Sequence, residues 1–227
     1  MKIFCLPFAG GNSHSYRALQ AYLPAAMTVQ GVELPGRGIR AAEPLCRSLE
    51  ALADDLYGHL ARDFAAGVYA LFGHSMGAAT AYLLMLRIRA GGLPLPRAVV
   101  LSGKSAPSLA ESRSRHLLGT VAFRAMLKQM GGCPPEVLAE KELMDYFEPI
   151  LRADFEAVET WRPTRGEPLD VPALVLHGRQ DEMPRAHLEA WASEFSSPVE
   201  FHEFEGGHFF IQRHWAQIAR LVVKRIG

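Results

Sequence analysis

The chain has 227 residues, 49% of them hydrophobic, which is enough to bury a substantial core in one domain or at most two. Its 24 Lys and Arg residues balance 24 Asp and Glu residues, so the zero formal charge argues against nucleic acid as a partner. No apolar stretch could span a bilayer, and no signal-peptide pattern precedes the first apolar run, so we expect a cytoplasmic protein without membrane contact. The three cysteines are expected to be reduced thiols. We expect one domain, residues 1–227.

Short apolar runs alternate with longer stretches of helical periodicity along the chain. Runs that read as nearly continuous Val, Leu and Phe indicate strands of a parallel sheet that helices cover on both faces. The pattern therefore predicts an α/β fold with a mainly parallel sheet. The predicted strands are residues 2–6, 27–34, 68–72, 98–102, 173–177 and 199–204.

The strand 68–72 runs directly into Gly73-His74-Ser75-Met76-Gly77, and a helix is predicted from about residue 76 to about residue 90. Gly-x-Ser-x-Gly between a strand and a helix is typical of the nucleophile elbow of α/β-hydrolases. The two glycines leave room for a turn so tight that the serine backbone is strained. We therefore predict that Ser75 is a nucleophile at the carboxyl edge of the sheet.

The alternation of strands and helices breaks between residues 102 and 172. A helix is predicted over 112–130 with Phe123, Met126 and Met130 on one stripe, a second opens at Pro134-Pro135, and a third covers 142–161. This helical insertion, residues 107–161, can form a lid over a pocket or simply complete the core, and the residues alone favour neither. We name Phe123, Met126 and Met130 as candidate substrate-facing residues.

A serine hydroxyl needs a base, and in this fold class the acid and the histidine follow the serine in chain order. Asp181 lies in the loop after strand 173–177, and His208 follows the last strand, 199–204, behind Gly206-Gly207. His208 is predicted to accept the proton of Ser75 while Asp181 holds its tautomer. Glu182 is the alternative acid.

The tetrahedral intermediate of acyl transfer also needs two backbone N–H donors. Met76, the residue after the nucleophile, is predicted to supply one. The loop after the first strand is predicted to supply the other through Phe8 or Ala9, between which the sequence does not discriminate. No histidine spacing is typical of a zinc site, and we expect neither a metal nor a cofactor.

Several motifs together resemble the stand-alone type II thioesterases of polyketide and nonribosomal peptide pathways, which belong to the α/β-hydrolase superfamily. They are Pro7-Phe8-Ala9-Gly10-Gly11, Glu33-Leu34-Pro35-Gly36-Arg37-Gly38, the elbow, the segment from Met130 to Leu138, Leu151-Arg152-Ala153-Asp154-Phe155, and Gly206-Gly207-His208.

The resemblance covers nearly the whole chain and implies hydrolysis of acyl groups from the phosphopantetheine arm of an acyl or peptidyl carrier protein. The usual role is editing of misprimed or stalled assembly lines, here through an acyl-Ser75 intermediate, and we expect a monomer. Cys133 departs from the family's lid pattern and is interpreted as a small hydrophobic residue. The alternatives are an oxygen-ester esterase or acyltransferase with the same triad, and a non-catalytic module that binds carrier proteins.

Overall fold

One parallel sheet of six strands organises the fold, with the strand order β2-β1-β3-β4-β5-β6. The computed structural model describes residues 1–110, 113–133, 135–163 and 166–226. The prediction of a parallel sheet is confirmed, because every strand pair runs in the same direction. The strands are β1 Lys2–Leu6, β2 Thr28–Gly31, β3 Tyr69–His74, β4 Ala98–Ser102, β5 Ala173–Gly178 and β6 Val199–Phe204.

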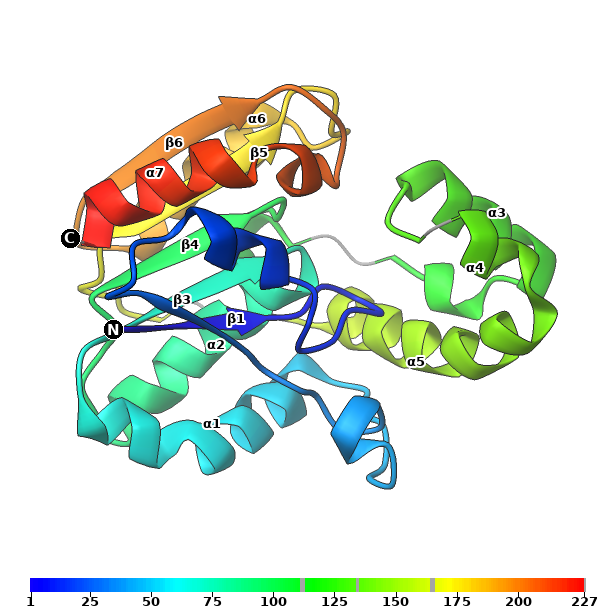
Figure 1. Cartoon of the computed structure of the whole chain (residues 1–227), viewed down its shortest axis with the longest axis horizontal. Coiled ribbons are helices and arrows are strands. Elements are labelled where there is room, and N and C mark those ends of the chain that lie inside the picture. The colour runs from blue at the N-terminus through cyan, green and yellow to red at the C-terminus, as the bar shows by residue number, and fades with distance from the viewer. Residues whose placement is uncertain (111–112, 134, 164–165, 227) are drawn as a thin grey trace.

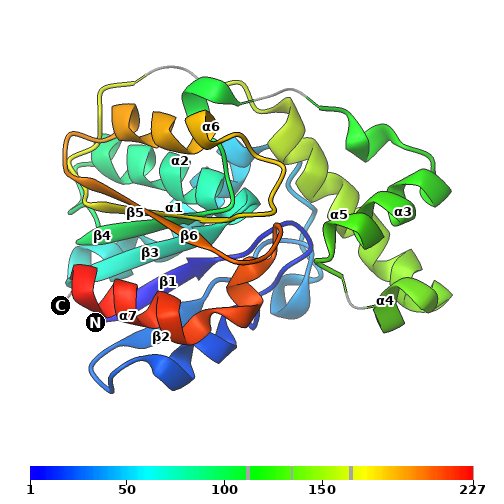
Figure 2. The ribbon, with the colours of Figure 1, turned by 90° about the horizontal axis from the view of Figure 1, so that it is seen from above.

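Helices cover both faces of the sheet (Figures 1 and 2). On one face, α1 (Leu49–Ala66), α2 (Met76–Ala90) and α6 (Arg185–Glu189) enclose the larger apolar cluster of the core. On the other face, α7 (Trp215–Ile226) buries Ile218, Val222 and Ile226 against a second cluster. Residues four apart share one face of a helix, so α7 presents a single apolar stripe to the sheet.

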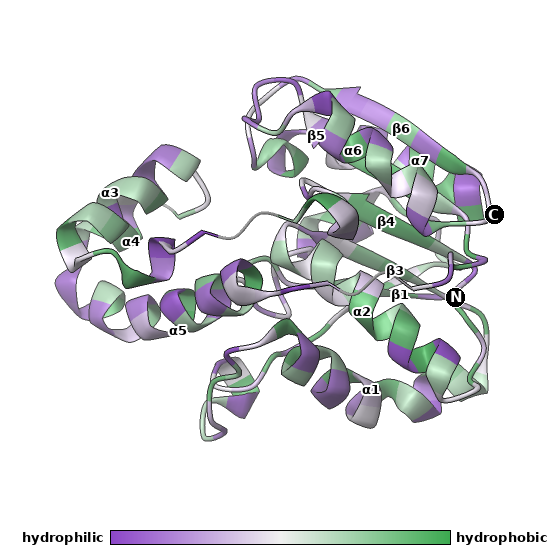
Figure 3. Cartoon of the chain, turned by 180° about the vertical axis from the view of Figure 1, so that it is seen from behind, coloured by the Kyte–Doolittle hydropathy of each residue, from purple (hydrophilic) through white to green (hydrophobic). Residues whose placement is uncertain are grey.

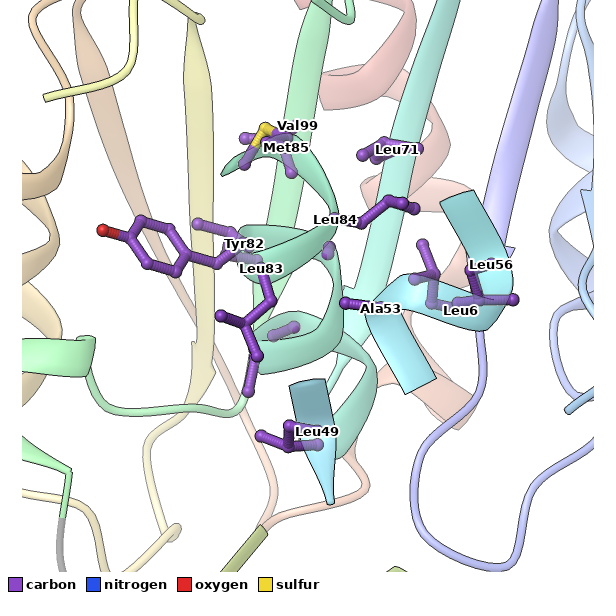
Figure 4. Packing of buried hydrophobic residues seen from close by; sticks show 14 of the residues in the cluster. Leu6, Leu49, Ala53, Leu56, Leu71, Tyr82, Leu83, Leu84, Met85 and Val99 are labelled. Carbon is purple, nitrogen blue, oxygen red and sulfur yellow. The ribbon is translucent and has the colours of Figure 1, made fainter. Parts of the chain in front are cut away.

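The helix that follows the elbow is buried on nearly all sides. Leu84 of α2 packs between the sheet and α1, close to Leu71 and Ala53, as Figure 4 shows. A helix that is hydrophobic all round belongs in the core of a layered fold. In Figure 3, β4 in the middle of the sheet is hydrophobic, whereas the edge strand β6 carries many hydrophilic residues. The elbow therefore lies between a buried strand and a buried helix.

The helical insertion lies between β4 and β5 and projects beyond the end of the sheet toward which β1 points (Figure 1). It consists of α3 (Thr120–Met130), α4 (Pro135–Ala139) and α5 (Lys141–Thr160). Its helices share a small apolar cluster of their own, which includes Phe123, Leu127 and Phe155. None of the helices in the described part of the chain is both long enough and apolar enough to cross a bilayer.

Two predicted elements were too long. The helix predicted over 112–130 begins at Thr120, because Gly119 has an extended backbone and a separate 3₁₀ turn, Arg115–Leu117, precedes it. The strand predicted over 27–34 ends at Gly31, since its partner β1 runs into Pro7, which has no N–H to continue the ladder. Residue 112 and Pro134 lie outside the described residues.

Candidate active site

Ser75 occupies the turn between β3 and α2 with a strained backbone, φ 54° and ψ −115°. No other non-glycine residue in the described ranges has a positive φ. A side chain on Gly73 would collide with the carbonyl of Gly77, and one on Gly77 would collide with that of Leu6. The backbone N–H of Ser75 donates to the carbonyl of Ser102 on β4, 2.7 Å away. The fold thus holds this serine in the geometry of a nucleophile elbow.

The structure brings Ser75, His208 and Asp181 together, although they come from three separate loops. The Nε2 atom of His208 lies 3.0 Å from Ser75 Oγ, and its Nδ1 atom lies 2.8 Å from Asp181 Oδ2. The side chains of His208 and Asp181 are 16% and 12% exposed, so water has little access to their hydrogen bond. Glu182, the alternative acid, is exposed. This order of groups can activate a hydroxyl for attack on a carbonyl carbon.

The loop that carries His208 crosses directly over the end of β5. A side chain on Gly178 would collide with the carbonyl oxygens of Gly206 and Gly207. The N–H of Gln180 donates to the carbonyl of Gly206 at 3.0 Å, and the side-chain carbonyl of Gln180 accepts from the N–H of Gly206. These contacts bind the acid loop to the base loop, so Asp181 and His208 are positioned as one unit.

Two candidate oxyanion donors remain in the loop after β1. The N–H of Gly11 donates to the carbonyl of Phe8 at 2.8 Å, which makes a turn with Gly10 at φ +76°. The N–H of Gly10 donates to Asp154 Oδ2 at 2.8 Å and is therefore occupied. The N–H groups of Phe8 and Ala9 donate to no residue that the structure describes. Met76 opens α2, so its N–H has no acceptor within the helix.

His74 packs beneath the base. Its ring is fully buried, with the centroid 5.0 Å from that of His208, and its Nδ1 atom lies 2.9 Å from Ser102 Oγ. Burial, and secondarily the charge of His208, lower the pKa of His74 well below its ordinary value. A neutral His74 does not compete for the proton of Ser75, and its ring supports that of His208 from below.

A cavity of about 160 Å³ opens onto Ser75 and His208. Most of its walls are apolar side chains, which suit an acyl group. The core contributes Phe8, Met76 and Phe209, and the insertion contributes Leu127, Met130, Val137, Phe147, Leu151, Phe155 and Val158. Arg115 also reaches the wall, where its Nε donates to Glu159 at 2.6 Å.

Of the three residues expected to face the substrate, Met130 alone lies on the cavity wall. Phe123 is fully buried inside the insertion, where its ring meets that of Phe155 edge to face and the guanidinium of Arg152 lies 4.3 Å from its centroid. Met126 packs against the same cluster and is also away from the cavity. The stripe of α3 that holds Phe123 and Met126 therefore turns mainly toward α5, and neither residue lines this cavity.

The apolar face of α5 was missed as the main wall of the cavity. Phe147, Leu151 and Phe155 recur every four residues, which is the signal of one helix face, but periodicity alone does not tell whether that face meets a core or a cavity. Cys133 also lines the cavity, and burial raises the pKa of its thiol. A raised pKa favours the protonated thiol, which agrees with the interpretation of Cys133 as a small hydrophobic residue.

Comparison with known proteins places this geometry in a family. The model of the thioesterase domain matches residues 1–226. The chain belongs to the thioesterase family. The thioesterase PikA5 of Streptomyces venezuelae is 31% identical over 219 residues, which cover 96% of this chain and 78% of that protein.

Solved structures of thioesterases superpose over the whole chain. The type II thioesterase BorB from the borrelidin biosynthetic cluster is 32% identical with a TM-score of 0.91, and the match covers 100% of this chain and 92% of BorB. RedJ, from the prodiginine pathway of Streptomyces coelicolor, is also 32% identical with a TM-score of 0.91, over 97% and 89% of the two chains. The predicted α/β-hydrolase fold, the thioester hydrolase activity and the resemblance to type II thioesterases are confirmed.

Proposed function

We propose that this thioesterase removes acyl groups from the phosphopantetheine arm of acyl or peptidyl carrier proteins and so edits a polyketide or nonribosomal peptide assembly line. One observation carries the proposal above the others. Ser75, His208 and Asp181 form a continuous chain of hydrogen bonds, and the cavity that opens onto Ser75 has mostly apolar walls that suit an acyl group. We also expect the protein to act as a monomer in the cytoplasm.

The reaction follows from the positions of the groups. Nε2 of His208 accepts the proton as Ser75 Oγ attacks the thioester carbonyl, and Asp181 stabilises the imidazolium that forms. Backbone N–H groups of Met76 and of Phe8 or Ala9 bind the oxyanion. The C–S bond then breaks, and the arm leaves as a thiol with the proton from His208. Water, activated by the same imidazole, hydrolyses the acyl-Ser75 ester and releases a carboxylic acid.

We propose that the insertion, residues 107–161, acts as the lid of the acyl cavity. The connection between α3 and α4 rests on the core at Phe209, beside His208, and a side chain on Gly132 would collide with that ring. Both Gly132 and Phe209 line the cavity, so this contact forms part of its wall. The carrier protein would dock near the lid, with its arm entering beside Met76.

The substrate class is tested by comparing the turnover of one acyl group on a holo carrier protein, on coenzyme A and as an oxygen ester. We expect the carrier thioester to have the highest kcat/KM, because the protein part of the substrate adds contacts outside the cavity. Faster turnover of the oxygen ester would favour the esterase alternative, and acyl transfer to an added alcohol or amine would favour an acyltransferase. A chain that a fluorophosphonate probe fails to label at Ser75 would be a binding module.

The lid is tested by a pair of methionines on α3. Met130→Gln places an amide on the cavity wall and is expected to lower the ratio of long-chain to short-chain acyl turnover about tenfold, since one group in an apolar pocket changes selectivity by 1–3 kcal/mol. Met126→Gln makes the same chemical change away from the cavity and is the matched control. Equal ratios in both variants would mean that α3 does not shape the acyl site.

A further inference from the structure

A deeply buried ion pair near the site lies outside the proposed triad. Arg37 and Asp154 are 5% and 0% exposed and form two parallel hydrogen bonds, from Nη2 to Oδ1 at 2.6 Å and from Nη1 to Oδ2 at 2.7 Å. Arg37 follows Gly36 in the turn after β2, and Asp154 lies on α5 in the insertion. The pair therefore joins the core of the protein to the insertion.

Both members of the pair also hold the loop after β1. Asp154 Oδ2 accepts the N–H of Gly10 at 2.8 Å, and Nη1 of Arg37 donates to the carbonyl of Gly11 at 3.1 Å. The loop packs closely on α5, because a side chain on Gly10 would meet Leu151. The ion pair thus binds two successive residues of this loop, Gly10 through its N–H and Gly11 through its carbonyl.

We propose that Asp154 is a positioning residue of the oxyanion site. By accepting the Gly10 N–H, and with Arg37 by fixing the Gly11 carbonyl, it orients the preceding peptide planes of the loop, so that the Phe8 or Ala9 N–H points at the oxygen of a substrate carbonyl bound beside Ser75. This inference rests on the proposed acyl transfer at Ser75. A residue 144 positions away in the chain thereby controls the alignment of a catalytic donor.

Two physical arguments favour this role over a purely stabilising one. Taking two charges out of water costs several kcal/mol, so a buried ion pair is often no more stable than apolar residues of the same volume. A carboxylate, however, is a strong and directional acceptor for a backbone N–H, and the bidentate guanidinium fixes its plane. The ion pair therefore fixes the orientation of the loop's backbone groups. An oxyanion site needs such fixed donors before the negative charge develops on the substrate oxygen.

A proline divides α5 into two parts. Pro149 lies inside the helix, and the anchored residues Leu151 and Asp154 follow it. A proline in the interior removes one helical hydrogen bond and permits a kink. The residues that contact the loop after β1, Leu151 and Asp154, therefore both lie on the part of α5 that follows this proline.

The test compares two double variants that both lack the charges. Arg37→Met with Asp154→Asn keeps a side-chain oxygen that can accept the Gly10 N–H, whereas Arg37→Met with Asp154→Leu keeps the volume and removes the acceptor. We expect the asparagine variant to retain kcat within about tenfold of the native protein. The leucine variant should lose about 10²–10³ in kcat with KM unchanged, the loss typical of one oxyanion donor.

A second readout follows the oxyanion itself. The affinity of a boronate, which forms a tetrahedral adduct with the serine, should fall in parallel with kcat, while the affinity for a thioether analogue of the substrate should not change. Equal kcat and equal boronate affinity in the two double variants would overturn the proposal. If the leucine variant does not fold, Asp154→Ser in the same background, too short to reach Gly10, gives the same comparison.

The outcome does not depend on which substrate the protein prefers. If the native chain hydrolysed an activated oxygen ester and no carrier thioester, the proposed function would fail, but the two double variants could still be compared on that ester. If the native chain edits carrier proteins and the variants are equal, Asp154 is structural and the proposed function stands. The two failures are therefore distinct.

Discussion

Replacing Ser75 with Ala is expected to abolish acyl-enzyme formation and to lower thioester turnover about 10⁶-fold, as removal of the serine does in a serine protease. The reason is that Ser75 Oγ lies 3.0 Å from Nε2 of His208, and in the described residues no other serine occupies a strained elbow. Mass spectrometry of the protein after brief exposure to an acyl thioester should show the acyl adduct in the native chain and none in the variant.

A matched control exists in the same molecule. Ser105 Oγ lies 3.4 Å from Nδ1 of His187, so Ser105→Ala also removes a hydroxyl beside an imidazole. Ser105 lies in the loop after β4 and His187 on α6, and Ser105 lacks the strained backbone of the elbow. We expect Ser105→Ala to keep nearly full activity. Substantial acyl-enzyme in Ser75→Ala would contradict the mechanism and direct attention to another nucleophile.

Replacing Asp181 with Asn should leave the fold intact and lower kcat by about 10⁴, the effect of the equivalent change in a protease triad. The amide would present its N–H₂ group to Nδ1 of His208, which favours the tautomer that cannot accept the proton of Ser75. Steady-state kinetics on a carrier thioester, with circular dichroism to verify folding, measures the loss.

Glu182→Gln is the control for the acid, since it makes the same chemical change at the adjacent, exposed position. The expected result is turnover within about twofold of the native protein, which agrees with the small effect of most exposed substitutions. The reverse pattern, with Glu182→Gln inactive and Asp181→Asn active, would show that the loop rearranges in solution to present the other carboxylate.

Much of the fold and of the candidate triad was predictable because local chemistry dictates it. Residues 2–6 and 98–102 are strands with the predicted bounds, since a parallel strand buried on both faces must be apolar along its length. The edge strand 199–204 also has the predicted bounds, although it carries several hydrophilic residues. The elbow was recognisable from its two glycines, which are needed because their neighbours leave no space for a side chain. Asp181 and His208 were recognisable as the candidate acid and base because they come after Ser75 in the chain, in that order, and each follows one of the last two strands.

The cavity wall and the anchor of the oxyanion loop were not predictable in the same way. The sequence pattern of an apolar helix face is the same whether that face packs on a core or lines a cavity. The pattern therefore could not show that Leu151 lines the cavity and that Phe123 is buried in the insertion. Asp154 lies among charged residues of a helix, where a carboxylate usually faces water. Its partner Arg37 is far away in the chain, and the pairing of such distant residues depends on the tertiary structure, not on local pattern.

The sheet order has a consequence for how the enzyme is made. Strands β3, β4, β5 and β6 stand side by side in the order in which they leave the ribosome. Synthesis runs from the N-terminus, so these strands emerge in the order in which they pair. Ser75 is synthesised early, whereas Asp181 and His208 follow the last two strands. An unfinished polypeptide therefore holds an inert hydroxyl, and only a completed copy can react with the thioesters around it.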